Sequence, residues 1–360
     1  MKIGLFGGSF NPIHKGHILL AKEAIEKLNL DKLIFIPANQ NPFKKDENYI
    51  DGKHKLEMIK IVLEDKMEVS DFEVKRKHVS YTIDTVNHFK TKYPHDELFF
   101  LVGSDNVNKL NKWKDIQSIS EKVQLVILER GNEYSKVNLK KYGCIKLKNK
   151  IFNFSSTTYR NGDFSQVEKE VQRYIGANWL YFPQIAKSQL STERFKHLVF
   201  TAELAAKLAE VNKQSVRKAY QAGFMHDVAK EWSQKKQYSY LEKYGFDKEN
   251  LESYKLHQLC AYYYLKNEYM YPEEDVLNAI KIHTTLAFEL SELDKIVFVA
   301  DKLCQGRKWN GIQKIREIAL ENLDEGLKHV ILECCIKFNN EKGAKISEEQ
   351  QKIYDKWLSY

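Results

Sequence analysis

The spacing of apolar residues changes about halfway along this chain of 360 residues. Up to about residue 182, short apolar runs alternate with stretches of helical periodicity such as 15–29. The runs that predict buried strands are 3–6, 33–36, 98–102 and 123–128. Strands that alternate with helices predict a parallel sheet covered on both faces, which is a doubly wound α/β domain. From about residue 190 the apolar residues recur every three to four positions, and this periodicity predicts an all-α domain.

The two patterns predict two domains and a tail. We expect the α/β domain at residues 1–185, the all-α domain at 190–335 and a polar tail at 338–360, to which the sequence assigns no function. A short bridge at 182–191 joins the domains. The helices expected in the second domain are 192–211, 213–230, 252–268, 273–283 and 292–304.

Charge and cysteine usage narrow the class of protein. The net charge is +8 with dispersed lysines, which suits small polyanions such as nucleotides and gives no sign of a nucleic-acid-binding tail. The five cysteines lack C-x-x-C spacing, so we expect reduced thiols and no cysteine-built metal site. No signal-peptide pattern or membrane-length apolar stretch is present in the sequence. We therefore expect a cytoplasmic protein without a nucleic-acid or membrane partner, and the sequence leaves its oligomeric state open.

The segment GGSFNPIHKGH follows the first expected strand. Gly7 and Gly8 allow the backbone to approach a ligand closely. A helix that begins near His14 places His17 one turn later on the same face. Free N–H groups at a helix start attract phosphate, and two imidazoles there can stabilise charge that develops on a leaving group. The segment therefore predicts nucleotidyl transfer, with attack on the α-phosphate of a nucleotide and release of pyrophosphate.

Two later segments carry side chains suited to a nucleotide. In FSSTTYRNG, Ser156 is expected to cap a helix whose N-terminus forms a second phosphate site with Thr157 and Arg160. Asp105 follows an expected strand and suits a ribose hydroxyl, magnesium or a helix N-cap. Trp113 suits stacking on a pyridine ring or a place in the core.

This half of the chain resembles bacterial nicotinate-mononucleotide adenylyltransferases of the H-x-G-H nucleotidyltransferase superfamily. Besides the opening motif, the resemblance rests on IPANQNPFKK, VSDFEVKRKHVSYTIDTV, FFLVGSDNVNKLNKW and FSSTTYRNG. It implies a Rossmann-like sheet, ATP and nicotinate mononucleotide as substrates, and Mg²⁺ as cofactor. By the resemblance, His14, His17 and Arg160 are catalytic. The nucleotide- or substrate-binding residues are Gly7, Gly8, Phe10, Lys44, Thr85, Gly103, Asp105, Trp113, Ser156 and Thr157. Thr85 and Trp113 would contact the nicotinate nucleotide. Transfer to phosphopantetheine is the alternative, and the SYTIDT segment and Trp113 argue against it.

In the second half, histidine and aspartate recur within apolar helical segments. The candidates are His197, His226, Asp227, His257, His283 and Asp301. Together they predict polar side chains that converge inside a helical bundle, where a metal would compensate their burial. Imidazole and carboxylate without thiolate suit Fe, Mn, Mg or Co. Six ligands are enough for two metal ions that hold a phosphate and supply a hydroxide.

Residues 190–330 resemble the HD phosphohydrolase superfamily, through the spacing of these candidates and the HTT and DKIVFVADKL segments. The similarity is greatest to the bacterial family that cleaves diadenosine tetraphosphate symmetrically to two ADP. It implies an all-α HD-type fold and Fe, Mn or another divalent metal, in one or two sites. The implied core ligands are His197, His226, Asp227 and Asp301.

The same resemblance assigns further roles. Asp227 would also be catalytic, and His257 and His283 would hold a second metal or the substrate phosphates. Lys230 and Arg307 would contact the substrate, a dinucleoside polyphosphate. Two alternatives stay open. The second half could act on another phosphate ester, such as guanosine tetraphosphate or a nucleoside triphosphate, or it could sense nucleotides without turnover.

Overall fold

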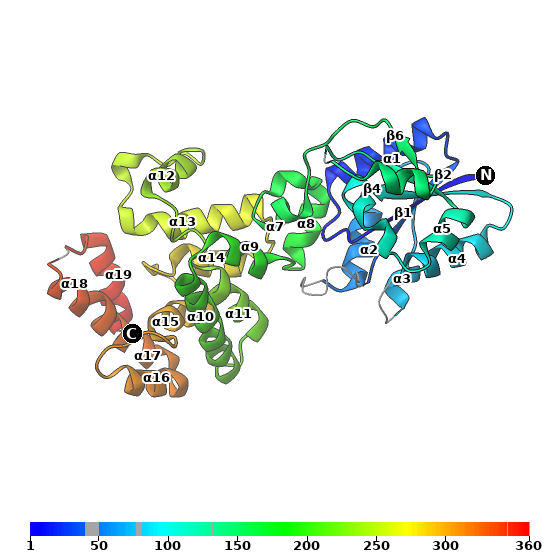
Figure 1. Cartoon of the computed structure of the whole chain (residues 1–360). Coiled ribbons are helices and arrows are strands. Elements are labelled where there is room, and N and C mark those ends of the chain that lie inside the picture. Colours follow the sequence, from blue (N-terminus) through cyan, green and yellow to red (C-terminus); the bar gives the residue numbers. More distant parts are fainter. Residues whose placement is uncertain (40–49, 77–80, 132, 344, 360) are drawn as a thin grey trace. The chain divides into compact units, whose positions relative to one another are not determined.

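A computed structural model describes residues 1–39, 50–76, 81–131, 133–343 and 345–359. The chain divides into two compact units, Met1–Tyr181 and Phe182–Tyr360, and each is described by itself (Figure 1). Lys44 lies outside the described residues. None of the described helices is long and apolar enough to cross a membrane.

Six parallel strands form the sheet of the first unit, in the order β3-β2-β1-β4-β5-β6. The strands are β1 (Lys2–Gly8), β2 (Lys32–Pro37), β3 (Met67–Val69), β4 (Glu97–Gly103), β5 (Gln124–Leu128) and β6 (Ile145–Leu147). The chain moves outward from β1 to β3 and then returns to place β4 on the other side of β1. This order confirms the expected Rossmann-like fold, and it reverses direction between β1 and β4.

Helices cover both faces of this sheet (Figure 1). The α-helices are α1 (Lys15–Lys27), α2 (Gly52–Ile61), α3 (Phe72–Lys75), α4 (Thr82–Lys92), α5 (Ile116–Lys122), α6 (Lys136–Lys141), α7 (Ser156–Arg160) and α8 (Lys169–Ala177), and the 3-10 helices are η1 (Ser104–Lys112) and η2 (Phe164–Gln166). Successive strand side chains point to opposite faces. Ile3 and Leu5 therefore share a core with Val86 of α4, whereas Phe6 contacts His17 of α1 on the other face.

The second unit is helical, as predicted. Its α-helices are α9 (Phe182–Gln189), α10 (Thr192–Val211), α11 (Val216–Met225), α12 (Gln234–Glu242), α13 (Leu256–Tyr263), α14 (Glu274–Ile282), α15 (Glu292–Leu303), α16 (Ile312–Glu321), α17 (Leu323–Val330), α18 (Phe338–Glu341) and α19 (Glu348–Ser359). The remaining turns of helix are η3 (Lys248–Asn250), η4 (Ser253–Lys255), η5 (Tyr264–Glu268) and η6 (Ile331–Lys337).

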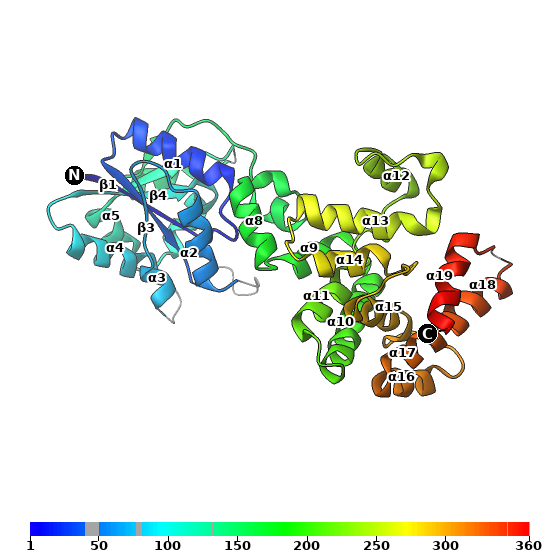
Figure 2. The ribbon, with the colours of Figure 1, turned by 180° about the vertical axis from the view of Figure 1, so that it is seen from behind.

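Helix α15 lies at the centre of this unit, in contact with α10, α11, α14 and α17 (Figure 2). Its residues from Leu293 to Asp301 are all buried. Residues 296–300, with the sequence IVFVA, are apolar on all sides of the helix, and such a segment is typical of the interior of a bundle. Asp301 is thereby held inside the unit.

The structure differs from the predicted elements at several places. The helix expected at 213–230 is α11, which ends at Met225. The bridge expected at 182–191 is helix α9, and the first unit ends slightly before residue 185. The edge strands β3 and β6 have three residues each, which is too short to leave a periodic signal. The expected tail at 338–360 contains α18 and α19, and α19 is packed within the second unit.

Candidate functional sites

A cavity of about 440 Å³ lies in the first unit, where β1 and β4 end. The strand order reverses between these two strands, and ligands of such sheets bind in that crevice. Loops after both strands therefore face one space, although they are far apart in sequence. The predicted residues that line the cavity are Gly7, Gly8, Phe10, His14, His17, Gly103, Asp105, Trp113, Ser156, Thr157 and Arg160.

The two histidines of the opening motif meet at the start of α1. His14 precedes the helix and His17 lies in its first turn, and their rings stack with centroids 3.5 Å apart. The backbone N–H of His14 donates to Nδ1 of His17 at 3.1 Å. In a neutral ring the Nε2 of His17 therefore carries the proton and can donate it to a ligand. His14 Nδ1 is buried without a hydrogen-bond partner among the described residues.

Both imidazoles are held in the neutral form. Burial lowers the pKa of His14 to about 3, and the nearby positive charge of Arg130 contributes in the same direction. Burial, then His14, then Arg130 hold the pKa of His17 well below its ordinary value. The free protein therefore presents two uncharged rings to the cavity at neutral pH.

The start of α7 forms another wall of the cavity, and here the predicted cap is wrong by one residue. Ser155 Oγ accepts hydrogen bonds from the backbone N–H groups of Thr157 and Thr158, at 3.1 and 3.4 Å. Ser156 Oγ instead donates to the carbonyl of Pro12 at 2.8 Å. Either serine satisfies the preference for a cap, so the sequence could not distinguish them.

Arg160 and the β4 loop complete the site. Arg160 donates to the carbonyl of Asn11, which fixes the guanidinium beside the loop that precedes α1. A Cβ at Gly103 would lie 2.4 Å from Oδ1 of Asp105 and 3.2 Å from Nε of Arg130, so a larger residue here would displace these two side chains. Asp105 lies 3.7 Å from Arg130 and does not cap η1, whose N-cap is Gly103. Half-buried Trp113 lines the cavity.

Two predicted side chains are held by contacts within the protein. The ring of Phe10 is 1% exposed and packs edge-on against Phe6 and His17, so it joins the core although it borders the cavity. Thr85 is buried and donates to Oε1 of Glu73 at 2.5 Å. Among the described residues it is Glu73, and not Thr85, that lines the cavity.

Several residues that line this cavity were not singled out from the sequence. Those with a charged or phenolic side chain are Glu73, Tyr81, Lys112, Lys114 and Arg130. Arg130 had a usable signal, because it follows the strand predicted at 123–128 and carboxyl ends of strands face the ligand. The others lie beside irregular segments, where periodicity gives no guidance.

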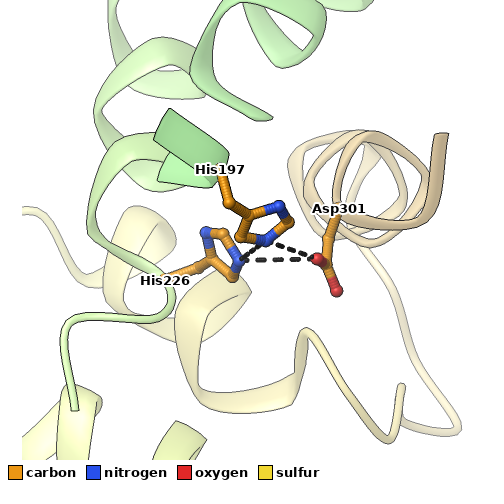
Figure 3. A group of neighbouring side chains, drawn as sticks. All are labelled: His197, His226 and Asp301. Carbon is orange, nitrogen blue, oxygen red and sulfur yellow. Dashed lines mark hydrogen bonds and ion pairs between the residues drawn. The ribbon is translucent and has the colours of Figure 1, made fainter. Parts of the chain in front are cut away.

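The second candidate site lies inside the second unit, where α10, α15 and the end of α11 meet. Figure 3 shows the rings of His197 and His226 directed toward the carboxylate of Asp301. His197 Nε2 lies 3.3 Å from His226 Nε2 and 3.0 Å from Asp301 Oδ1. His226 Nε2 lies 3.6 Å from the same oxygen. These three ligand atoms are close enough to bind one metal ion.

A second possible ligand group overlaps the first. It consists of His226, Asp227 and His283. Asp227 Oδ2 lies 3.5 Å from His226 Nε2, and its Oδ1 lies 3.4 Å from His283 Nε2. His257 Nε2 adjoins this group, 3.2 Å from His283 Nε2. All six predicted candidates thus form one cluster, with His226 shared between two groups that could each hold an ion.

The chemistry of these donors fits a divalent cation. Nδ1 of His226 lies 2.7 Å from the carbonyl oxygen of Gly223, and Nδ1 of His283 lies 2.7 Å from that of Ile280. Because a carbonyl can only accept, each Nδ1 carries a proton, and in its neutral form each ring directs the lone pair of Nε2 into the cluster. Asp227 Oδ1 faces these lone pairs and accepts no hydrogen bond within the described chain. A cation would satisfy all of them.

A cavity of about 860 Å³ opens beside the cluster. Lys230 Nζ lies 3.2 Å from His257 Nε2, and Arg307 donates to Asp301 Oδ1 at 3.0 Å, so both predicted substrate contacts lie at its edge. The basic side chains that line it are Arg194, Lys230, Lys302, Arg307, Lys308 and Lys337. A wall of this composition suits a chain of phosphates.

Arg194 is the most informative residue that sequence reasoning missed here. It pairs with Asp227 Oδ2 at 2.8 Å and lies three residues before His197, on the same face of α10. That spacing was a usable signal. Trp309 and Phe338, which also line the cavity, had none.

Comparison with known proteins matches both halves of the chain. Residues 5–162 match the cytidylyltransferase-like family and residues 194–306 match the HD domain. The "Probable nicotinate-nucleotide adenylyltransferase/Ap4A hydrolase" of Mycoplasma genitalium is 34% identical over 335 residues, which are 90% of this chain and 95% of that protein. The chain belongs to the family of nicotinate-nucleotide adenylyltransferase/Ap4A hydrolases. The protein of the same name from Mycoplasma pneumoniae is 32% identical over 304 residues, 83% of this chain and 87% of that protein.

A solved structure also matches part of the chain. A protein from Clostridium acetobutylicum described as a "predicted HD superfamily hydrolase involved in NAD metabolism" is 30% identical. The match covers 49% of this chain and 95% of that protein, with a TM-score of 0.47. The opening motif lies within the cytidylyltransferase-like match, and the histidine and aspartate cluster lies within the HD match. Each matched region of this bifunctional enzyme family therefore contains one of the two candidate sites.

Proposed function

We propose that the first unit transfers the adenylyl group of ATP to nicotinate mononucleotide, giving deamido-NAD and pyrophosphate. The observation that carries this proposal is the stacked, neutral pair His14 and His17 at the start of α1, in the cavity where the strand order reverses. The names of the family's members support the choice of substrates.

The reaction needs positioning more than proton transfer. The phosphate of nicotinate mononucleotide is already an anion, so it attacks the α-phosphorus of ATP without a general base, and the bond to the pyrophosphate oxygen breaks. The Nε2–H of His17 and the free N–H groups at the start of α1 would hold the phosphate oxygens as charge develops on the leaving group. Arg160 and Thr157 would hold the phosphate oxygens from the opposite wall of the cavity, at α7. Mg²⁺ would enter with the phosphates of ATP.

We also propose that the second unit hydrolyses diadenosine tetraphosphate symmetrically to two ADP. The proposal is supported by a cluster of facing acceptor atoms at a cavity with a basic wall. Symmetric cleavage breaks the bond between the second and third phosphates. The middle of the phosphate chain must therefore lie over the cluster. Arg194, Lys230 and Arg307 would hold the flanking phosphates.

This second reaction requires a metal. The six residues of the cluster would hold one or two Fe, Mn or other divalent ions. A bound ion would polarise the phosphate and supply a hydroxide at neutral pH. The chain itself orients the ligands, since His226 and His283 are fixed through Nδ1 by backbone carbonyls.

A substrate panel tests both proposals. ATP would be offered with nicotinate mononucleotide, nicotinamide mononucleotide or phosphopantetheine, and the second site with diadenosine tetraphosphate, guanosine tetraphosphate or GTP. We expect the highest kcat/KM for nicotinate mononucleotide and ADP as the only product from diadenosine tetraphosphate. Preferred transfer to phosphopantetheine would refute the first proposal. Release of AMP and ATP, or faster turnover of either guanosine nucleotide, would refute the second.

A further inference from the structure

We propose that helix α19, at the C-terminal end of the chain, positions the turn that carries His283 and Thr284 at the second site. Gln350 and Trp357 would then be positioning residues for the hydrolase reaction, and this inference rests on the function proposed for that site. The turn comprises residues 283–288, with the sequence HTTLAF, and is called the 283–288 turn below.

The 283–288 turn forms part of the second site. His283 is the C-cap of α14 and belongs to the ligand cluster. Thr284 lines the cavity, and its Oγ1 lies 3.1 Å from Nε2 of His257. Leu286 has a φ of +61°, in the left-handed region that a branched side chain rarely adopts. Such a conformation persists only where the surroundings hold it, so the turn requires support from other elements.

Support on the inner side comes from Gln258 of α13, the neighbour of His257. Gln258 Oε1 accepts a hydrogen bond from the backbone N–H of Thr284 at 3.0 Å. Its Nε2 donates to Oγ1 of Thr285 at 3.1 Å. The turn and the helix that carries His257 are therefore linked through one buried amide.

Support on the outer side comes from α19. Gln350 Nε2 donates to the carbonyl of Thr285 at 2.6 Å, and this bond is buried. Trp357 Nε1 donates to the carbonyl of Ala287 at 2.8 Å. Lys356 adds a third bond, to the carbonyl of residue 288. Three side chains of one helix thus bind three carbonyls of one short turn.

The sequence of α19 is organised for this contact. Gln350, Ile353, Tyr354 and Trp357 recur at helical spacing on one face, and all four are buried. Gln351, next to Gln350, instead donates within the helix to Asp355 at 2.7 Å. A carbonyl that loses its buried donor is left unsatisfied, so removal of Gln350 is expected to shift the turn rather than leave it unchanged.

The test compares Gln350→Met with Gln351→Met in the full chain. Both changes remove a glutamine amide from α19, but only the first breaks a bond to the 283–288 turn. Mn²⁺ binding by the metal-depleted protein is titrated first, and hydrolysis of diadenosine tetraphosphate is then measured with saturating Mn²⁺. For Gln350→Met we expect about tenfold weaker Mn²⁺ binding, a tenfold lower kcat and a KM within twofold. For Gln351→Met we expect wild-type values, and adenylyl transfer is expected to stay unchanged in both.

A second variant guards against loss of folding. If Gln350→Met melts below the assay temperature, Trp357→Phe is used in its place. This change keeps most of the ring and removes the N–H donor. We expect at least threefold weaker Mn²⁺ binding by Trp357→Phe. Equal Mn²⁺ affinity and kcat in the two glutamine variants, or wild-type affinity in Trp357→Phe, would overturn the proposal. If wild-type protein binds Mn²⁺ but does not cleave diadenosine tetraphosphate, the proposed substrate is wrong, and the Mn²⁺ titration still decides the role of α19.

Discussion

Histidine is held in two different ways at the two candidate sites, and the hydrogen-bond partner of Nδ1 determines which chemical task each ring suits. In the first unit, His17 accepts a backbone N–H through Nδ1 and keeps Nε2–H as a donor toward the cavity. In the second unit, His226 and His283 donate Nδ1–H to backbone carbonyls and present lone pairs toward the cluster. A donor suits phosphate oxygens, whereas a lone pair suits a metal. Both tasks are local consequences of where a carbonyl or an N–H lies.

Replacement of His17 tests the donor task. We predict that His17→Ala lowers kcat for adenylyl transfer by about a hundredfold or more, as loss of one transition-state donor does. His95→Ala is the matched control, because that histidine is exposed on the same unit. Hydrolysis by the second unit is expected to stay unchanged in both variants. Near-normal adenylyl transfer in His17→Ala would contradict the donor role of His17.

The protonation state of His14 is a separate prediction. Its pKa in the folded chain is about 3, below the unfolded value of about 6.5. The stability linked to its neutral form is therefore fully present above pH 6.5 and is lost as the pH falls toward 3. We expect the His14 imidazole signal, assigned by comparison with His14→Asn, to show no titration between pH 8 and 5 in an NMR experiment. A midpoint near 6.5 would contradict the burial described above.

At the scale of elements, the sequence predicted the long, buried strands and helices. It missed the short edge strands and two arginines whose place in a site depends on the fold. The central strands and α10 are continuous apolar patterns, and the metal-ligand candidates stood out because charged groups are rare in such helices. The edge strands were too short for a pattern. Arg130 and Arg194 were missed because arginine is common on surfaces, and its role here depends on which strand end or helix face it occupies.

The packing of α11 against α10 gives an element-scale prediction. A Cβ at Gly223 would lie 2.9 Å from the Cα of Ala202 and 3.0 Å from its backbone nitrogen, and backbone cannot move aside as a side chain can. We predict that Gly223→Ala lowers the stability of the second unit by about 1–3 kcal/mol. It should also weaken Mn²⁺ binding, since Gly223 provides the carbonyl that orients His226. Thermal unfolding and Mn²⁺ titration measure these two effects. An unchanged melting temperature together with an unchanged Mn²⁺ affinity would show that α10 and α11 can move apart without cost.

At the scale of the whole molecule, each unit contains one candidate site, and the two proposed reactions differ in the metal they would use. Adenylyl transfer would use an ion that accompanies ATP, whereas the imidazole-rich cluster of the second unit suits a transition metal. We predict that Mg²⁺ restores only adenylyl transfer to metal-depleted protein, and that Mn²⁺ or Fe²⁺ is needed to restore hydrolysis. Both activities are measured after each addition. Full recovery of hydrolysis with Mg²⁺ alone would contradict the ligand chemistry inferred for the cluster.

One experiment tests directly whether this chain contains two independent active sites. Wild-type protein and the His226→Ala, Asp227→Ala double variant are each incubated with ATP and nicotinate mononucleotide, and separately with diadenosine tetraphosphate, in the presence of Mg²⁺ and Mn²⁺. Products are resolved by chromatography. We predict deamido-NAD from both proteins at equal rates, and ADP from the wild type alone. ADP release that survives in the double variant, or deamido-NAD synthesis that disappears with it, would contradict the assignment of the two reactions to two separate sites.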